Sequence, residues 1–184
     1  ARPCVGLSGG GRIVTVDPVE NQPEESRGEG AHARGVGSAG RAVVESLRLR
    51  RWLADLERFC FFVGYARSGS TLVGAILNAH PEIVIANELD VLAYVERGFD
   101  RKKIFSLLLQ QERQFAATGY QWTGYDYAVP GQYQGTFERL RVIGDKRAGR
   151  STHRLRANPG LLDLVRRTVK VPIRIVHVVR NPYD

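Results

Sequence analysis

The feature that most constrains the fold is an apolar segment that runs through a glycine-rich turn into a helical pattern. Residues 59–63 (FCFFV) form a continuous apolar run rich in aromatic side chains, which is typical of a buried parallel strand. The chain continues as GYARSGS and then TLVGAILNAH, which predicts a helix that ends before Pro81. Phosphate-binding loops occupy this strand–loop–helix setting. We therefore expect an anion site between the strand and the helix.

Further apolar runs and helical spacings alternate along the rest of the chain. The predicted strands cover residues 83–86, 141–143 and 173–179, and the predicted helices cover residues 43–56, 89–95, 103–117 and 161–169. Residues 119–135 are polar and aromatic with several glycines, and we expect a long surface loop near a site there. Alternating strands and helices indicate a P-loop-like α/β fold of three layers with a largely parallel central sheet.

Residues 1–40 differ from the rest in being rich in Gly, Glu, Arg, Ser and Pro. They carry too little apolar surface to offset the entropy of ordering, so we predict a disordered tail. The chain also contains no methionine and stops at Asp184, directly after a strand-like run. We therefore expect a C-terminally truncated fragment of a longer coding sequence, in which residues 41–184 form the first part of a domain.

Composition excludes several classes of protein. The 184 residues are 43% hydrophobic and 25% charged, as in a single globular domain. No apolar run approaches the roughly 18 residues of a membrane span, and the first 40 residues contain no signal-peptide pattern. Cys4 and Cys60 lack metal-ligand spacing and are not expected to form a disulfide, so we predict no metal site and a cytoplasmic location.

The chain is basic, with a formal net charge of +8 and 23 arginines against 4 lysines. This bias has two interpretations, either a preference of the coding sequence or an electropositive cleft for an anionic ligand. The basic residues are spread along the chain and match no DNA- or RNA-binding motif. We therefore expect no nucleic-acid partner.

The loop after the first strand resembles a Walker A motif with one informative difference. It has the GxxxxG spacing, but Ser70 stands where the motif has lysine, and Thr71 occupies the hydroxyl position. A loop without that lysine lacks the usual contact to the β- and γ-phosphates of a nucleoside triphosphate. The loop could still bind an anion. The donors would be its backbone N–H groups, the start of the helix, the Arg67 guanidinium and the Ser68 hydroxyl.

Three segments of the chain resemble the sulfotransferase family. FFVGYARSGSTL is similar to the family's 5′-phosphosulfate loop, and LNAHPEIVIANELD is similar to the segment that follows it in protein-tyrosine sulfotransferases. IRIVHVVRNPYD is similar to the family's 3′-phosphate motif, a strand that ends in an arginine turn. Together the matches cover about residues 59–90 and 141–184. Residues 41–184 would then be the N-terminal part of a sulfotransferase domain.

The resemblance implies 3′-phosphoadenosine 5′-phosphosulfate (PAPS) as co-substrate, with no metal. The residues expected to hold the 5′-phosphosulfate are Arg67, Ser68, Gly69, Ser70 and Thr71. Arg180 would bind the 3′-phosphate, together with a serine that the family carries beyond the position of Asp184.

The resemblance also implies two catalytic residues, Glu88 and Lys146. Glu88 corresponds to the general base of the tyrosine-directed members, with Asp90 as a competitor, or else it is a solvated glutamate at a helix start. Lys146 follows a short predicted strand and would stabilise the leaving group, or else it is a surface lysine in a basic loop.

Three histidines are weighed against these residues as alternative bases. His177 lies in an apolar strand and is expected to be a core histidine, and His80 is expected to cap a helix. His153 stays open as a base.

The sequence thus predicts a sulfotransferase that uses PAPS and an acceptor with a hydroxyl or amine group. The alternatives are a P-loop nucleotide kinase or NTPase, and a truncated non-catalytic nucleotide-binding module. The acceptor and the oligomeric state stay unassigned by the sequence.

Overall fold

The computed structural model of the protein describes residue 47 and residues 49–181. The expected tail at residues 1–40 lies outside that range. A helical segment at residues 49–54 leads into the first strand. It lies within the helix predicted at 43–56 but ends two residues earlier, and residues 43–46 and 48 lie outside the described range.

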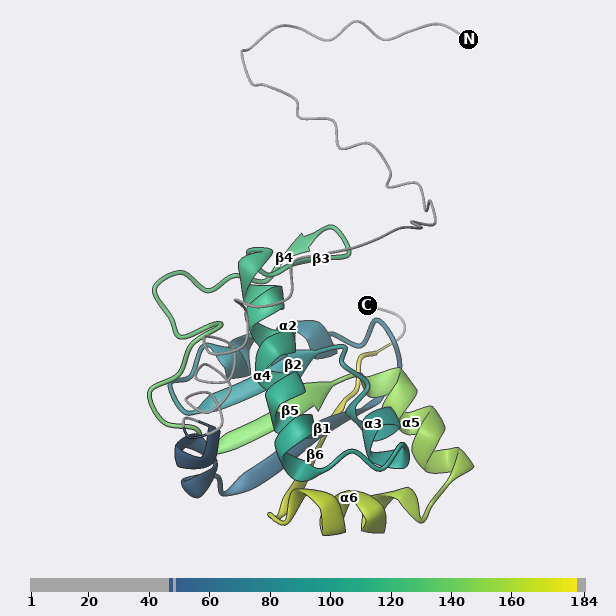
Figure 1. Ribbon diagram of the computed structural model, residues 1–184. Coiled ribbons are helices and arrows are strands. Elements are labelled where there is room, and N and C mark those ends of the chain that lie inside the picture. Colours follow the sequence, from purple (N-terminus) through teal and green to yellow (C-terminus); the bar gives the residue numbers. More distant parts are fainter. Residues whose placement is uncertain (1–46, 48, 182–184) are drawn as a thin grey trace, which may run out of the picture.

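Four parallel strands form the central sheet (Figure 1). They are β1 (Arg58–Gly64), β2 (Ile83–Asn87), β5 (Val142–Lys146) and β6 (Ile173–Val178), in the spatial order β2-β5-β1-β6. The parallel sheet places the carboxyl ends of all four strands at one edge, where α/β proteins bind their ligands.

Helices cover both faces of the sheet because alternate residues of β1 are apolar on both sides. Phe59 and Phe61 pack on one face against α3 (Val91–Glu96), α4 (Arg101–Ala117) and α6 (Leu161–Val169). Cys60 and Phe62 pack on the other face with residues of α2 (Ser70–Asn78). Figure 1 shows α4 crossing one face of the sheet. The predicted three-layer α/β fold with a parallel sheet is confirmed.

Two elements differ from the sequence prediction. The strand predicted at 141–143 continues to Lys146, because β5 stays paired with β2 as far as the register pair Asn87 and Lys146. Helix α5 (Ala148–Ala157) was not predicted, since its sequence AGRSTHRLRA has no apolar stripe and only Ala148 and Ser151 are buried.

The predicted loop at 119–135 contains a short hairpin, formed by β3 (Gln121–Trp122) and β4 (Tyr125–Asp126). Figure 1 shows the hairpin beyond one end of α4, outside the main sheet. No helix in the described part of the chain is both long and apolar enough to cross a bilayer.

Candidate active site

The carboxyl edge of the sheet carries a cleft of about 590 Å³. It is lined by the loop after β1, by Glu88 after β2 and by Arg180 after β6. Arg147 and Arg150, around the start of α5, also line it. Residues from four different strand ends therefore meet in one place, as the parallel topology requires. Arginines supply several of its walls, so the described cleft is electropositive, and this favours the second interpretation of the arginine bias.

The loop between β1 and α2 holds backbone conformations that suit close approach of a ligand. Arg67 has φ 69° and Gly69 has φ 90°, both in the left-handed region, and Gly69 precedes α2 without a side-chain cap. A non-glycine residue in this region is uncommon, and such residues cluster at functional sites. The buried Ser68 hydroxyl has no hydrogen-bond partner among the described residues. The loop thus presents backbone and hydroxyl donors for an anion.

Helix α5 fixes the point at which the loop leaves β1. The Gly64 N–H donates to the Thr152 hydroxyl over 2.8 Å. Gly64 has φ +125°, and a Cβ atom there would lie 3.0 Å from Cδ2 of His177. A larger residue at this position would be strained both by its backbone angles and by the histidine ring.

Lys146 joins the loop to the predicted base. Its Nζ lies 2.9 Å from the Thr71 hydroxyl oxygen and 2.7 Å from Oε1 of Glu88. The Lys146 side chain is only 3% exposed, so the interpretation as a surface lysine in a basic loop is wrong. Burial lowers the pKa of Lys146, and the hydrogen bond to Glu88 opposes that change. The ammonium absent from loop position 70 is thus supplied by β5.

Glu88 is held in an unusual conformation. The φ of Glu88 is 63°, and its N–H donates to the carbonyl oxygen of Lys146 over 3.0 Å. The Arg147 guanidinium donates to the carbonyl oxygen of Glu88. Nη1 of Arg147 also lies 3.5 Å from Oε2 of Glu88. The Glu88 side chain is 29% exposed, and its carboxylate is paired with two cations at the cleft.

The nearby carboxylates have other partners. Asp90 forms two hydrogen bonds of 2.9 Å with Arg154, so it is committed to a guanidinium of α5. Asp145 is fully buried and accepts from the backbone N–H groups of Leu89 (3.1 Å) and Val91 (2.8 Å). Burial raises the pKa of Asp145 to about 7, against the two backbone hydrogen bonds. Asp145 thereby fixes the turn that carries Glu88.

None of the three candidate histidines, His80, His153 and His177, is among the residues that line the cleft with Glu88. His177 is exposed, because β6 is an edge strand of the described sheet, so its prediction as a core histidine is wrong. His80 is also exposed and its Nδ1 accepts from the backbone N–H of Glu82, which stabilises the turn after α2. His153 is exposed on α5 and is not among the residues that line the cleft.

A second cleft of about 580 Å³ adjoins the first on the side of β6. Arg67 and Arg180 line both clefts, and Ser68 and His177 line the second one. Two guanidinium groups therefore stand where the two hollows meet. Among the described residues, no group of three or more His, Cys, Asp or Glu side chains is placed to hold a metal ion.

Sequence reasoning missed several residues of the cleft. The missed aromatic residues Trp122, Tyr125 and Tyr127 come from the predicted loop, and the missed cations are Arg147 and Arg150. The aromatic content of residues 119–135 indicated a site in general terms. The cations could have been found from their positions one and four residues after Lys146.

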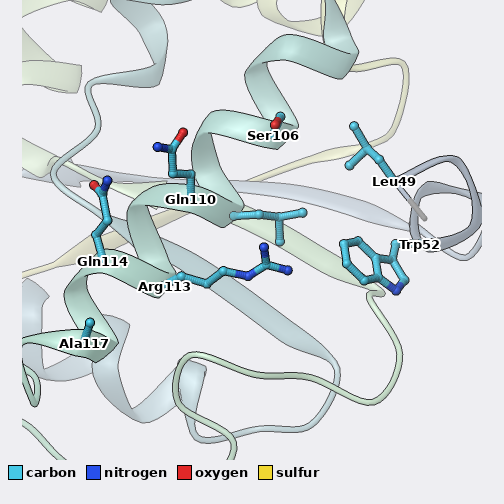
Figure 2. Close-up of a pocket in the computed structure, with 8 residues that line it drawn as sticks. Leu49, Trp52, Ser106, Gln110, Arg113, Gln114 and Ala117 are labelled. Atoms are coloured by element: carbon cyan, nitrogen blue, oxygen red, sulfur yellow. The ribbon is translucent and has the colours of Figure 1, made fainter. Parts of the chain in front are cut away.

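A pocket of about 640 Å³ lies elsewhere on the molecule, between α4 and the segment before β1 (Figure 2). Arg113 extends from α4 toward Trp52, with its guanidinium carbon 5.7 Å from the centre of the indole ring. Leu49 and polar residues of α4, such as Gln110, complete the lining. No residue predicted for catalysis or PAPS binding lines this pocket, so its volume does not mark it as the reaction site.

Comparison with protein families gives a match to a model described as the sulfotransferase family, over residues 60–184. A search of curated proteins finds no match. The family match covers more than half of the chain, and its range includes the glycine-rich loop, Glu88, Lys146 and Arg180.

Proposed function

The chain belongs to the sulfotransferase family, and from this premise we propose that it transfers a sulfuryl group from PAPS to a hydroxyl or amine acceptor. The observation that carries the proposal is the position of the Lys146 ammonium. It contacts Thr71 of the loop over 2.9 Å and Glu88 over 2.7 Å, so one cation links the proposed donor site to the proposed base.

The described residues suit the two anionic ends of PAPS. The unpaired Ser68 hydroxyl and the uncapped start of α2 are donors for the 5′-phosphosulfate, alongside Arg67, Gly69, Ser70 and Thr71. Arg180 lines both clefts and would hold the 3′-phosphate. Arginine is well matched to both groups because its planar fork can donate two parallel hydrogen bonds to a phosphate.

Glu88 and Lys146 have complementary roles in the proposed reaction. PAPS supplies an activated sulfuryl group. Glu88 accepts the proton of the acceptor as the acceptor oxygen or nitrogen bonds to sulfur and the bond from sulfur to the phosphate oxygen breaks. Lys146 stabilises the negative charge that grows on that oxygen, and a positioned cation of this kind acts most strongly where water is excluded. The burial of Lys146 supports this role.

The contacts of Lys146 and Asp145 on β5 also bear on the alternative that the protein is an NTPase. Since Lys146 brings an ammonium to Thr71, the missing Walker lysine alone no longer argues against a triphosphate. The acidic side chain next to it on β5, Asp145, is instead bound to the backbone N–H groups of residues 89 and 91. A Walker-type magnesium site needs an acid that faces the phosphates. This arrangement favours PAPS.

The cytoplasmic location stays part of the proposal. Cys60 is a free, buried cysteine, and burial raises the pKa of its thiol to about 11, so it is suited to core packing rather than redox chemistry. The proposed partners are PAPS or its product PAP and one acceptor, with no nucleic acid.

Nucleotide binding tests the proposal directly. PAP should bind the full-length protein and raise its Tm without added metal. Arg67→Ala and Arg180→Ala should each raise the Kd of PAP at least tenfold, because each removes a charge-assisted contact to phosphate. A larger Tm shift from ATP with Mg²⁺ would instead support the NTPase.

Turnover tests the catalytic assignment separately. Glu88→Gln should lower turnover about 10²- to 10⁴-fold while PAP affinity stays within twofold, since the residue is assigned to proton transfer. Wild-type turnover in Glu88→Gln would move the base elsewhere. A protein that binds PAP but turns over no acceptor in either form would match the non-catalytic alternative.

A further inference from the structure

The β3–β4 hairpin supplies one wall of the cleft that contains Glu88. Trp122, Tyr125 and Tyr127 line the cleft together with the arginines around the start of α5. The glycine-rich loop, Glu88 and Arg180 line the same cleft. If the loop and Arg180 hold the donor, as proposed, the hairpin residues are left to contact the acceptor.

Two aromatic side chains of the hairpin are exposed. Trp122 is 39% exposed and Tyr125 is 55% exposed. The two residues are register partners across the hairpin, and Thr123 (φ 49°) and Gly124 (φ 80°) form its two-residue turn. Positive φ at both turn residues is the type I′ geometry, which matches the natural twist of a hairpin.

Contacts beneath the hairpin tie it to the helices of the main domain. The buried Tyr120 ring packs 4.6 Å from the ring of Phe115 of α4, and Trp122 lies 6.1 Å edge-on to the same ring. The Gln134 amide donates to the carbonyl oxygens of Tyr127 and of Ala75 in α2, each over 3.0 Å. The exposed aromatics thus stand on a fixed base, so they can bind a ligand at little cost in conformational entropy.

The residues around this wall select the chemical class of the acceptor. Tryptophan and tyrosine present an apolar face and a polar tip, which suits a ring with C–H groups on one face and hydroxyls at its rim. A phenol, which is mostly apolar, would need an enclosed pocket that buries most of its surface. Arg150 and Arg147 line the same cleft, and Glu88 is already paired with cations, so an anionic substituent is favoured over a cationic one.

We propose that Trp122 and Tyr125 form the platform on which a pyranose acceptor with an acidic substituent stacks. One ring hydroxyl points to Glu88, and the carboxylate or sulfate of the acceptor faces Arg150. This inference rests on the proposed sulfotransfer and adds to it the class of the acceptor.

Binding to the PAP complex tests the platform without requiring turnover. The chain has two tryptophans, so the indole N–H signals of Trp122 and Trp52 can be followed together by NMR and assigned with Trp122→Phe. Methyl glucuronide should shift the Trp122 signal saturably while Trp52, which lines a different pocket, stays unchanged. Methyl glucoside should bind at least fivefold more weakly, since it lacks the carboxylate. Tighter binding of 4-methylphenol, or no saturable shift with either sugar, would overturn the proposal.

Variant kinetics provide the second arm. Trp122→Ala and Tyr125→Ala should each raise the KM for methyl glucuronide at least tenfold and leave the Kd of PAP within twofold, and Trp122→Phe should retain most of the affinity. Ile76→Ala is the matched control, because Ile76 is 56% exposed on α2 but does not line the cleft. Unchanged KM values in both alanine variants would refute the platform. Loss of PAP binding by the unmodified protein would instead refute the proposed function, so the two failures are distinguishable.

Discussion

Glu112→Gln should remove a large part of the pH dependence of stability. Glu112 lies on α4, is 3% exposed and accepts a hydrogen bond from the Tyr120 hydroxyl. Burial raises its pKa from 4.5 to about 8. A carboxyl whose pKa is higher in the folded state stabilises the fold below the unfolded pKa. This stability is lost as the pH rises through the folded pKa.

The size of the effect follows from those two pKa values. One pKa unit corresponds to about 1.4 kcal/mol, so full ionisation of buried Glu112 would cost up to about 5 kcal/mol. Between pH 6 and pH 8 the same linkage amounts to about 2 kcal/mol, because the group is only half ionised at pH 8. The unfolding free energy of the wild type should therefore fall by about 2 kcal/mol more than that of Glu112→Gln over this interval.

Urea denaturation at pH 6, 7 and 8, followed by circular dichroism, measures this difference. Comparing the two proteins cancels the contribution of Asp145, whose pKa is also raised by burial. Glu138→Gln is the matched control, since Glu138 also accepts from a tyrosine hydroxyl, that of Tyr133, but is exposed. It should leave the pH profile of the wild type unchanged. Parallel profiles for wild type and Glu112→Gln would refute the reasoning.

Two further predictions concern Lys146, which is proposed to be catalytic, and the core. Lys146→Ala should lower turnover about 10²- to 10³-fold in a sulfuryl-transfer assay, because it removes the buried cation assigned to the leaving group, and Lys146→Arg should not restore it. Turnover within threefold of wild type would contradict that role. Phe61→Ala should lower the unfolding free energy by about 3–5 kcal/mol in urea, because the side chain is fully buried between β1 and the helices of one face. A loss below about 1 kcal/mol would mean that the core repacks around the missing ring.

Local sequence patterns predicted the elements with apolar residues in regular spacing. The run FCFFV is β1, and the glycine-rich loop leads into α2 as expected. By contrast, the apolar part of β5 ends at Ile143, while its backbone pairing continues through Asp145 and Lys146. The strand end carries polar residues because it reaches the site, so hydrophobicity alone placed the boundary too early.

Tertiary contacts account for the features that local patterns missed. The apolar sequence of β6 predicted a buried strand, but strand order places it at the edge of the described sheet and leaves Ile175 49% exposed. Helix α5 is stabilised through Thr152 and through the pairing of Arg154 with Asp90, neither of which has a signal in periodicity. Trp122 and Tyr125 likewise line the cleft from a hairpin in which Trp122 packs against Phe115 of α4. The sequence could place the residues from Arg67 to Thr71 in one loop because they are consecutive, and four of them line the cleft.

The alignment of β5 against β2 decides which sign of charge meets the glycine-rich loop between β1 and α2. Successive residues of a strand point to opposite faces, so a slip of one residue exchanges the environments of neighbours. At the observed register, Lys146 pairs with Asn87 and points to Thr71, while Asp145 points to the backbone at Val91. A slip by one position would turn a carboxylate toward the loop and an ammonium into the apolar layer. Accurate strand pairing during folding is therefore also what places a positive charge next to the loop.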